Sequence, residues 1–258
     1  MSAKTQKPAF RAATTSRVTC LAVATGLCLA TATSVSASLF HSTATVKPVL
    51  VQAEVAANDP ETVRLLAGLA RIESELQLGN LLLQLGQADA ESSDFADPRA
   101  ETLPGIKDGL AAAGVADLEP LLQALEAGGD AATVTANYQK VITGLAVARS
   151  TLNPSNHDLL LSVAAQTTAA VALINASGPT EVRAYQDAWS MLMIARGQVD
   201  QLLGDADPAI VQAATEMGRD LDDVILSLPD PAVTEPVELD LAPIQALEAK
   251  MEGLAGAI

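Results

Sequence analysis

The sequence predicts an all-α fold, an antiparallel bundle of seven or eight helices. Aromatic residues make up only 2% of the chain, Ala and Leu dominate it, and the β-branched runs that favour strands are scarce. Apolar residues recur at helical spacing through most of the sequence. A helix-start signal, an aspartate followed by proline, occurs at Asp59, Asp97 and Asp207. Together these patterns favour helices joined by short connections, which pack as antiparallel neighbours.

The first 37 residues have the pattern of a cleaved secretory signal peptide. Four basic residues accompany an apolar run from Val18 to about Ala32, and small residues follow up to Ala37. This run is short for a membrane span, so we expect cleavage after Ala37, with an uncleaved N-terminal anchor as the alternative. We expect residues 38–58 to form a flexible lead and residues 59–258 to form a single helical domain.

Charge and cysteine content limit the function classes. Both cysteines, Cys20 and Cys28, lie in the expected signal, so the mature chain would have no disulfide and no thiolate ligand. Removing the four basic signal residues from 15 leaves 11 against 31 acidic ones, a net charge of about −20. Such a chain repels nucleic acid and anionic lipid and attracts cations or basic proteins. We expect a periplasmic or secreted protein without a membrane span after signal cleavage.

Capping residues, prolines and glycines predict the helix boundaries. The first helix is expected from Pro60 to about Leu85, before Gly86. After a polar segment at 87–96, Asp97 is expected to cap a helix that runs towards Ala113 and bends at Pro104. Five more helices are expected to begin near Asp117, Asp130, Ser155 or Asn156, Pro179 and Asp207, and a last one to span Ile244 to about Leu254. The proline-rich segment Pro229–Pro243 is expected to cross the bundle as an extended strap.

Catalytic and cofactor motifs are absent from the sequence. It contains no nucleophile elbow, P-loop, dinucleotide fingerprint, zinc-protease motif or CxxC pattern. Haem is disfavoured because CxxCH is missing and few aromatic residues could line a pocket. His157 stands alone at an expected helix start, where a surface or capping role is expected. We therefore expect no enzymatic activity and assign no catalytic residue.

An acidic group is the best candidate for a binding site. Asp94, Asp97 and Glu101 occur at i, i+3 and i+7, a spacing that would place them on one face if the whole segment were helical. Carboxylates about 6 Å apart repel by about 0.7 kcal/mol in water and about 3 kcal/mol at an effective dielectric constant of 20. A bound cation relieves that repulsion, and oxygen ligands suit Ca²⁺, Mg²⁺, Mn²⁺ or Fe³⁺. The alternative is a helix cap at Asp97 with solvated acids beside it.

The stretch from Glu75 to Glu101 resembles a family of secreted bacterial helical proteins. Their pattern is Gly-His-Leu-x-x-Gly followed by His-x-x-His-Pro-x-x-Glu, with Glu-Tyr-Gln-Asp on a later helix. The residues that match this frame in spacing are Leu76, Gly79, Gly86, Pro98, Glu101 and the run Tyr185-Gln186-Asp187-Ala188. Carboxylates replace the family's three histidines, at Glu75, Asp94 and Asp97, and Ala184 replaces the later glutamate.

The resemblance implies an all-helical periplasmic protein with a metal site linked to iron handling. Without the histidines, the site would take a harder cation through carboxylates, or it would be degenerate and only the fold would remain. The candidate ligands for a divalent or ferric cation are Glu75, Asp94, Asp97, Glu101 and Asp187.

Simpler roles exist for several of these residues. Arg71 could pair with Glu75, and Arg183 with Asp187, each at i, i+4 spacing. Tyr185 is expected to pack in the core, one helical turn from Trp189, with a hydrogen-bond partner for its hydroxyl.

The sequence therefore predicts a non-enzymatic periplasmic binding protein with a hard cation in a carboxylate cluster. The alternatives are an acidic helical interaction module for a basic or cell-envelope protein, with the strap as its docking segment, and a degenerate family member without a ligand.

Overall fold

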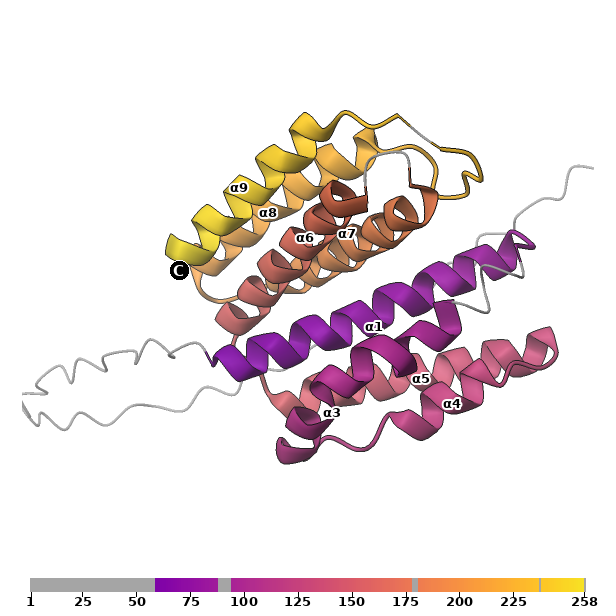
Figure 1. Ribbon diagram of the computed structural model, residues 1–258. Helices are drawn as coiled ribbons and strands as arrows, with labels where there is room; N and C mark the ends of the chain where they lie inside the picture. Colours follow the sequence, from indigo (N-terminus) through magenta and orange to yellow (C-terminus); the bar gives the residue numbers. More distant parts are fainter. Residues whose placement is uncertain (1–58, 88–93, 178–180, 237, 258) are drawn as a thin grey trace, which may run out of the picture. The chain divides into compact units, whose positions relative to one another are not determined.

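The helix α1, Pro60–Gln84, runs through the middle of the helical domain in the computed structural model (Figure 1). The structure describes residues 59–87, 94–177, 181–236 and 238–257, so the expected signal peptide and lead lie outside the described residues. α1 packs against two groups of helices. One group contains α6 and α7, and the other contains α3, α5 and a π-helical turn, η1.

The all-α prediction is confirmed: the described residues form eight α-helices and no strand. After α1, the elements in chain order are η1 (Pro98–Thr102), α3 (Leu103–Ala112), α4 (Glu119–Glu126), α5 (Ala131–Leu152), α6 (Asn156–Ser177), α7 (Val182–Leu202), α8 (Pro208–Ser227) and α9 (Leu241–Ala257).

Most helix ends lie where capping chemistry predicts them. The side chains of Asp59, Asp130 and Asp207 each accept a backbone N–H in the first turn of the helix that follows. Gly86, just past the end of α1, has a φ of +74°, a left-handed conformation that glycine adopts without strain. At the end of α5, Asn153 takes the same conformation with a φ of 47°.

Three boundaries differ from the expectation. Residues 94–97 are already helical, and Asp97 has helical backbone angles without a side-chain cap. The expected start at Pro179 lies outside the described residues, and Glu181 caps α7 instead. α9 begins at Leu241, which shortens the extended segment, because proline is tolerated in the first turn of a helix.

The core is aliphatic and falls into two clusters. One cluster comes from α6 to α9, and the other comes from α1, α3, α4, α5 and the segment before η1. The second half of α1 is apolar on several sides, and both Leu78 and Leu82 are fully buried. Leu81 and Leu83 are only partly buried, so other helices cover most of this half but not all of it.

Within the described residues, α6 contains one stretch long and apolar enough to cross a membrane. The stretch is Asn156–Ala176, with a mean hydropathy of 1.6, and half of its most apolar part is buried inside the fold. A core helix of a soluble protein has the same length and composition, so this observation is weak evidence for a span. In the structure α6 packs against α1, α7 and α9.

Because α1 contributes to the packing of both groups, truncating its core residues should be costly. Leu69 is fully buried, and Leu69→Ala should lower the free energy of unfolding by about 2–5 kcal/mol in urea denaturation. The control is Leu226→Ala on α8, where the side chain is 84% exposed and the change should stay within about 0.5 kcal/mol. Equal losses in the two variants would contradict the central role of α1.

Candidate functional site

The site begins on α1, where Arg71 and Glu75 lie one helical turn apart. The Arg71 Nε donates to Glu75 Oε1 at 2.7 Å, so the ion pair considered from the sequence forms. The Glu75 side chain is only 6% exposed. The Thr102 hydroxyl, which lies 3.1 and 3.3 Å from the two carboxylate oxygens, donates to the same group. Glu75 therefore has both a charged partner and a neutral donor.

Thr102 is the last residue of η1, which interrupts an otherwise helical segment. The N–H of Leu103 donates to the Pro98 carbonyl, which is the i to i+5 bond of a π-helix. Pro104 follows Leu103. It lacks an N–H, and in a regular α-helix its ring would clash with the carbonyl four residues earlier. A wider turn relieves this clash. The bend expected at Pro104 is thus a π-helical turn that lies just before it.

Arg183 of α7 connects three more of the candidate carboxylates. Its guanidinium lies 3.4 Å from Asp187 Oδ1 and 3.3 Å from Asp97 Oδ2, and it also forms an ion pair with Asp94. The pair with Asp187 spans one turn of α7, whereas Asp94 and Asp97 come from the segment before η1. A planar guanidinium with five N–H donors can serve several carboxylates at once.

The two arginines and the five carboxylates form one charged cluster. Arg71 interacts electrostatically with Asp187 and Glu101 as well as with Glu75, and Glu75 interacts with Asp187. Of the residues proposed as ligands, Glu75, Asp94, Asp97 and Asp187 lie in ion pairs with the two arginines, and Glu101 is added to this group by its electrostatic interaction with Arg71. We call this group, with Arg71 and Arg183, the carboxylate–arginine cluster.

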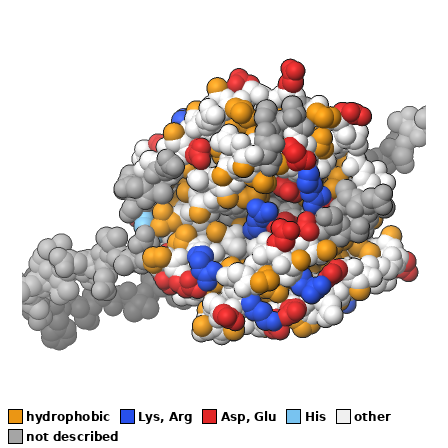
Figure 2. Space-filling model, in the orientation of Figure 1, with side chains coloured by type: hydrophobic (Ala, Val, Ile, Leu, Met, Phe, Trp, Pro, Cys, Tyr) orange, Lys and Arg blue, Asp and Glu red, His pale blue; other side chains and the backbone are white. Residues whose placement is uncertain are grey.

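Burial varies across the cluster. Asp94 is completely buried, and neither of its oxygens accepts a hydrogen bond from a described residue, so the ion pair with Arg183 is its polar contact there. The side chains of Asp97 and Asp187 are 30% and 20% exposed, and Glu101 is exposed. Figure 2 shows acidic and basic side chains next to one another across the middle of one face of the molecule.

Burial also changes the protonation equilibria. Desolvation raises the pKa of the Glu75 carboxyl above its ordinary value, against the opposing effect of Arg71. Desolvation likewise raises the pKa of Asp187, although Arg183 and Arg71 oppose it. Burial alone would lower the pKa of the Arg71 guanidinium, but the hydrogen bond and charge of Glu75 raise it above its ordinary value. Arg71 therefore remains charged, whereas the Glu75 and Asp187 carboxyls take up protons more readily than in water.

The position of Asp97 corrects one alternative considered for the sequence. A capping role was plausible because Pro98 follows it, but the backbone of Asp97 is helical and its side chain makes no cap hydrogen bond. Its carboxylate instead contacts Arg183. An Asp-Pro pair marks a helix start only when the aspartate lies outside the helix, and here the helix begins earlier.

A glycine of the resemblance frame brings the cluster together. A Cβ on Gly79 would lie 2.7 Å from the Phe95 ring and 2.9 Å from the Asp94 Cβ. No real Cβ tolerates such distances, so only glycine lets the segment with Asp94 approach α1 this closely. The packing of Asp94 and Phe95 explains why the position requires glycine.

Side chains of the run Tyr185-Gln186-Asp187 contact two different parts of the protein, the strap and the carboxylate–arginine cluster. The Tyr185 hydroxyl donates to the Pro229 carbonyl, and burial raises the pKa of Tyr185 to about 12. The Gln186 Nε2 donates to the carbonyls of Pro231 and Val233, at 2.9 and 3.2 Å. These two residues hold the start of the strap, whereas Asp187 faces the cluster. The hydrogen-bond partner expected for the Tyr185 hydroxyl is thus the Pro229 carbonyl, at the start of the strap.

Two features of the site were not predicted from the sequence. The pairs within α1 and α7 were recognised from their spacing, but the contacts of Arg183 with Asp94 and Asp97 join segments about 86 to 89 residues apart. The donor role of Thr102 depends on the π-helical turn. Prolines at 98 and 104 were the signal for an irregular helix, although they do not reveal which side chain it turns towards α1.

His157, in the first turn of α6, is half-buried, and neither ring nitrogen has a hydrogen-bond partner among the described residues. Among the described residues, no group of three or more His, Cys, Asp or Glu side chains has the arrangement of a metal site.

Comparison of the chain with protein-family models, curated proteins and solved structures gives no match. The family resemblance therefore stays a prediction.

Replacing Gly79 should disturb the cluster. Gly79→Ala should lower the free energy of unfolding by roughly 1–3 kcal/mol, because the added methyl group displaces Phe95 and Asp94. Gly197→Ala is the matched control, since Gly197 is also helical but has no atom within 4 Å of the added Cβ. That control should gain about 0.5–1 kcal/mol from helix propensity. Stabilisation by both substitutions would show that the contact at Gly79 is not tight.

The raised pKa of Glu75 predicts a pH dependence. As the pH rises above 4.5, the ordinary pKa of glutamate, the Glu75 carboxyl loses its proton in the unfolded chain at a lower pH than in the folded protein. The contribution of Glu75 to stability therefore decreases as the pH rises through its folded-state pKa. Glu75→Gln keeps an acceptor for Arg71 and Thr102 but removes the titration. The stability of the variant minus that of the wild type should therefore increase from about pH 4 to about pH 7, measured by urea denaturation. Parallel pH curves would contradict the raised pKa.

Proposed function

We propose that this protein is a non-enzymatic periplasmic binding protein whose carboxylate–arginine cluster holds a hard cation. The observation that carries this proposal is the charge of the cluster. Among the described residues, four carboxylates form ion pairs with two guanidinium groups, and Glu101 interacts electrostatically with Arg71. The cluster therefore contains more carboxylates than arginines.

The arrangement of the carboxylates suggests how an ion would be held. Oxygens of Glu75 and Asp94 face the arginines and are buried. Glu101 is exposed, and Asp97 and Asp187 are partly exposed, so these three side chains are accessible to an ion from solvent. Carboxylate oxygens and retained water molecules suit Ca²⁺, Mn²⁺ or Fe³⁺. The arginines would keep the buried carboxylates in place while the outer ones bind.

Thermal unfolding of the mature protein tests this proposal. An ion at one hundred times its dissociation constant should add about 2.7 kcal/mol and raise the melting temperature by roughly 5–10 °C. Ca²⁺, Mn²⁺ and Fe³⁺ are compared with NaCl at matched ionic strength, because screening alone also changes the stability of a charged protein.

Two variants separate binding from general electrostatics. Glu101→Gln removes an exposed carboxylate from the cluster and should reduce the ion-dependent shift while leaving the melting temperature without ion nearly unchanged. Asp223→Asn removes an exposed carboxylate from α8 and should leave the shift intact. If no ion raises the melting temperature above the NaCl control, or if the two variants behave alike, the cation proposal is wrong.

The second candidate is an acidic interaction module without a ligand of its own. It is favoured by the two arginines, which already form ion pairs with four of the five carboxylates. In this case the cluster joins α1, α7 and the η1 segment, and the remaining acidic surface recognises a basic protein of the cell envelope. The mature protein should then bind a basic partner with an affinity that falls steeply with salt, and metal ions should not change its melting temperature beyond the NaCl control.

A further inference from the structure

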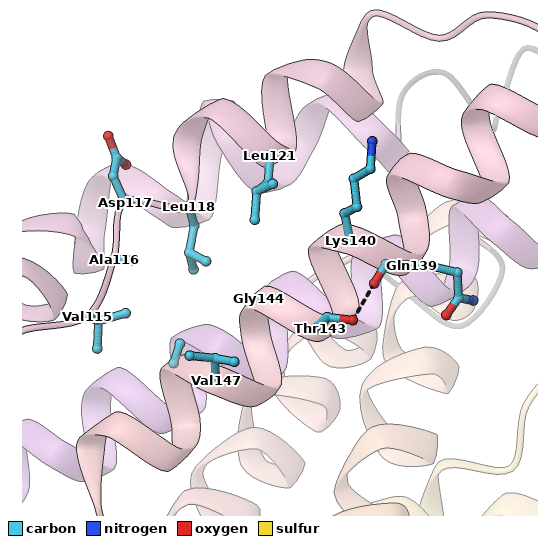
Figure 3. A pocket seen from close by; sticks show the side chains of 11 residues that line it. Val115, Ala116, Asp117, Leu118, Leu121, Gln139, Lys140, Thr143, Gly144 and Val147 are labelled. Carbon is cyan, nitrogen blue, oxygen red and sulfur yellow. Dashed lines mark hydrogen bonds between the residues drawn. The ribbon is translucent and has the colours of Figure 1, made fainter.

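A groove of about 490 Å³ lies between α5 and the start of α4 together with the connection that precedes it, outside the carboxylate–arginine cluster. Its walls are mainly apolar and come from Leu118 and Leu121 on one side and from Val147 on the other. Figure 3 shows these side chains along the groove, with Lys140 and Asp117 towards opposite ends. The volume falls in the range of small-molecule sites in proteins.

The groove exists because the two helices approach closely at one point and leave apolar surface uncovered beside it. A Cβ on Gly144 would lie 2.8 Å from a methyl group of Leu121, so glycine permits the contact there. One turn further along α5, Val147 is 57% exposed. Exposed valine beside a groove of this size is apolar surface that a ligand can bury.

The charged residues at the two ends of the groove differ in whether an opposite charge accompanies them. Asp117 lies 3.9 Å from the Lys107 ammonium, so a positive charge already accompanies it. Lys140 donates to the Asn137 side-chain oxygen at 3.1 Å. Among the described residues, every other Lys and Arg side chain lies in an ion pair with a carboxylate, whereas Lys140 does not.

This difference is informative because the protein is strongly acidic, with a formal net charge of −16. Carboxylates outnumber cations about two to one (31 to 15), yet none of those in the described residues neutralises the cation at the rim of this apolar groove. A ligand with an apolar body and one negative end matches both properties of the site.

We propose that the groove binds the anion of a fatty acid, with its carboxylate at Lys140 and its chain along Leu118, Leu121 and Val147. The lining residues of α5 extend from Gln139 to Ala148, a length of about 14 Å at the helical rise of 1.5 Å per residue. An extended hydrocarbon chain fits a groove of this length. The groove shares no lining residue with the carboxylate–arginine cluster, so this inference is independent of the proposed cation site.

Titration calorimetry with dodecanoate, below its micelle concentration, tests this assignment on the mature protein. Dodecanoate should bind at one site, and dodecanol, which has the same chain without the charge, should bind about fivefold more weakly. Lys140→Gln should remove this preference and leave dodecanol binding unchanged. Lys250→Gln, which removes a lysine that pairs with Asp220 on α8, is the matched control and should keep the preference.

A second variant tests the apolar wall. Val147→Trp places a bulky side chain in the groove at an exposed position, so it should fold normally and weaken both ligands roughly tenfold. The assignment is overturned if dodecanoate does not bind, if Lys140→Gln retains the preference, or if Val147→Trp binds both ligands as tightly as the wild type. Concentration-dependent dimerisation that Val147→Trp abolishes would overturn it in favour of a second copy of the chain as the occupant.

Discussion

The burial of α1 between two groups of helices is the constraint on which the rest of the structure depends. A chain with so few aromatic residues has to fill its core with small aliphatic side chains, which requires helices to pack closely on several sides. α1 satisfies this requirement with leucines around most of its second half. Two of its polar residues, Arg71 and Glu75, lie at the junction with α7 and η1.

The charged cluster follows from this packing. Buried carboxylates are costly unless a partner accompanies them, and the two arginines are those partners. Glycine at position 79 allows the acidic segment to approach α1, and the π-helical turn directs the Thr102 hydroxyl towards Glu75. The cluster therefore combines a stabilising role between helices with an excess of negative charge at its outer side, and both proposed functions start from that combination.

Local signals predicted much of this structure. The fold class and the caps at Asp59, Asp130 and Asp207 follow from residue type and spacing, and so do the ion pairs of Arg71 with Glu75 and of Arg183 with Asp187. The sequence did not predict that Asp97 lies inside a helix and caps nothing, because an Asp-Pro pair does not reveal whether the preceding segment is already helical. The contacts of Arg183 across helices depend on tertiary packing, which short-range spacing does not determine. The α4–α5 groove was missed for the same reason, since it results from one close contact at Gly144.

The position of Trp189 has a practical consequence. It is the single tryptophan of the chain, it lies on α7 two residues after Asp187, and it is half-buried. The first turns of this helix carry both the hydrogen bonds to the strap and the contacts of Arg183. Intrinsic fluorescence of this protein is consequently a single-site reporter, whose emission wavelength follows the solvation of the one helix that connects the strap with the carboxylates.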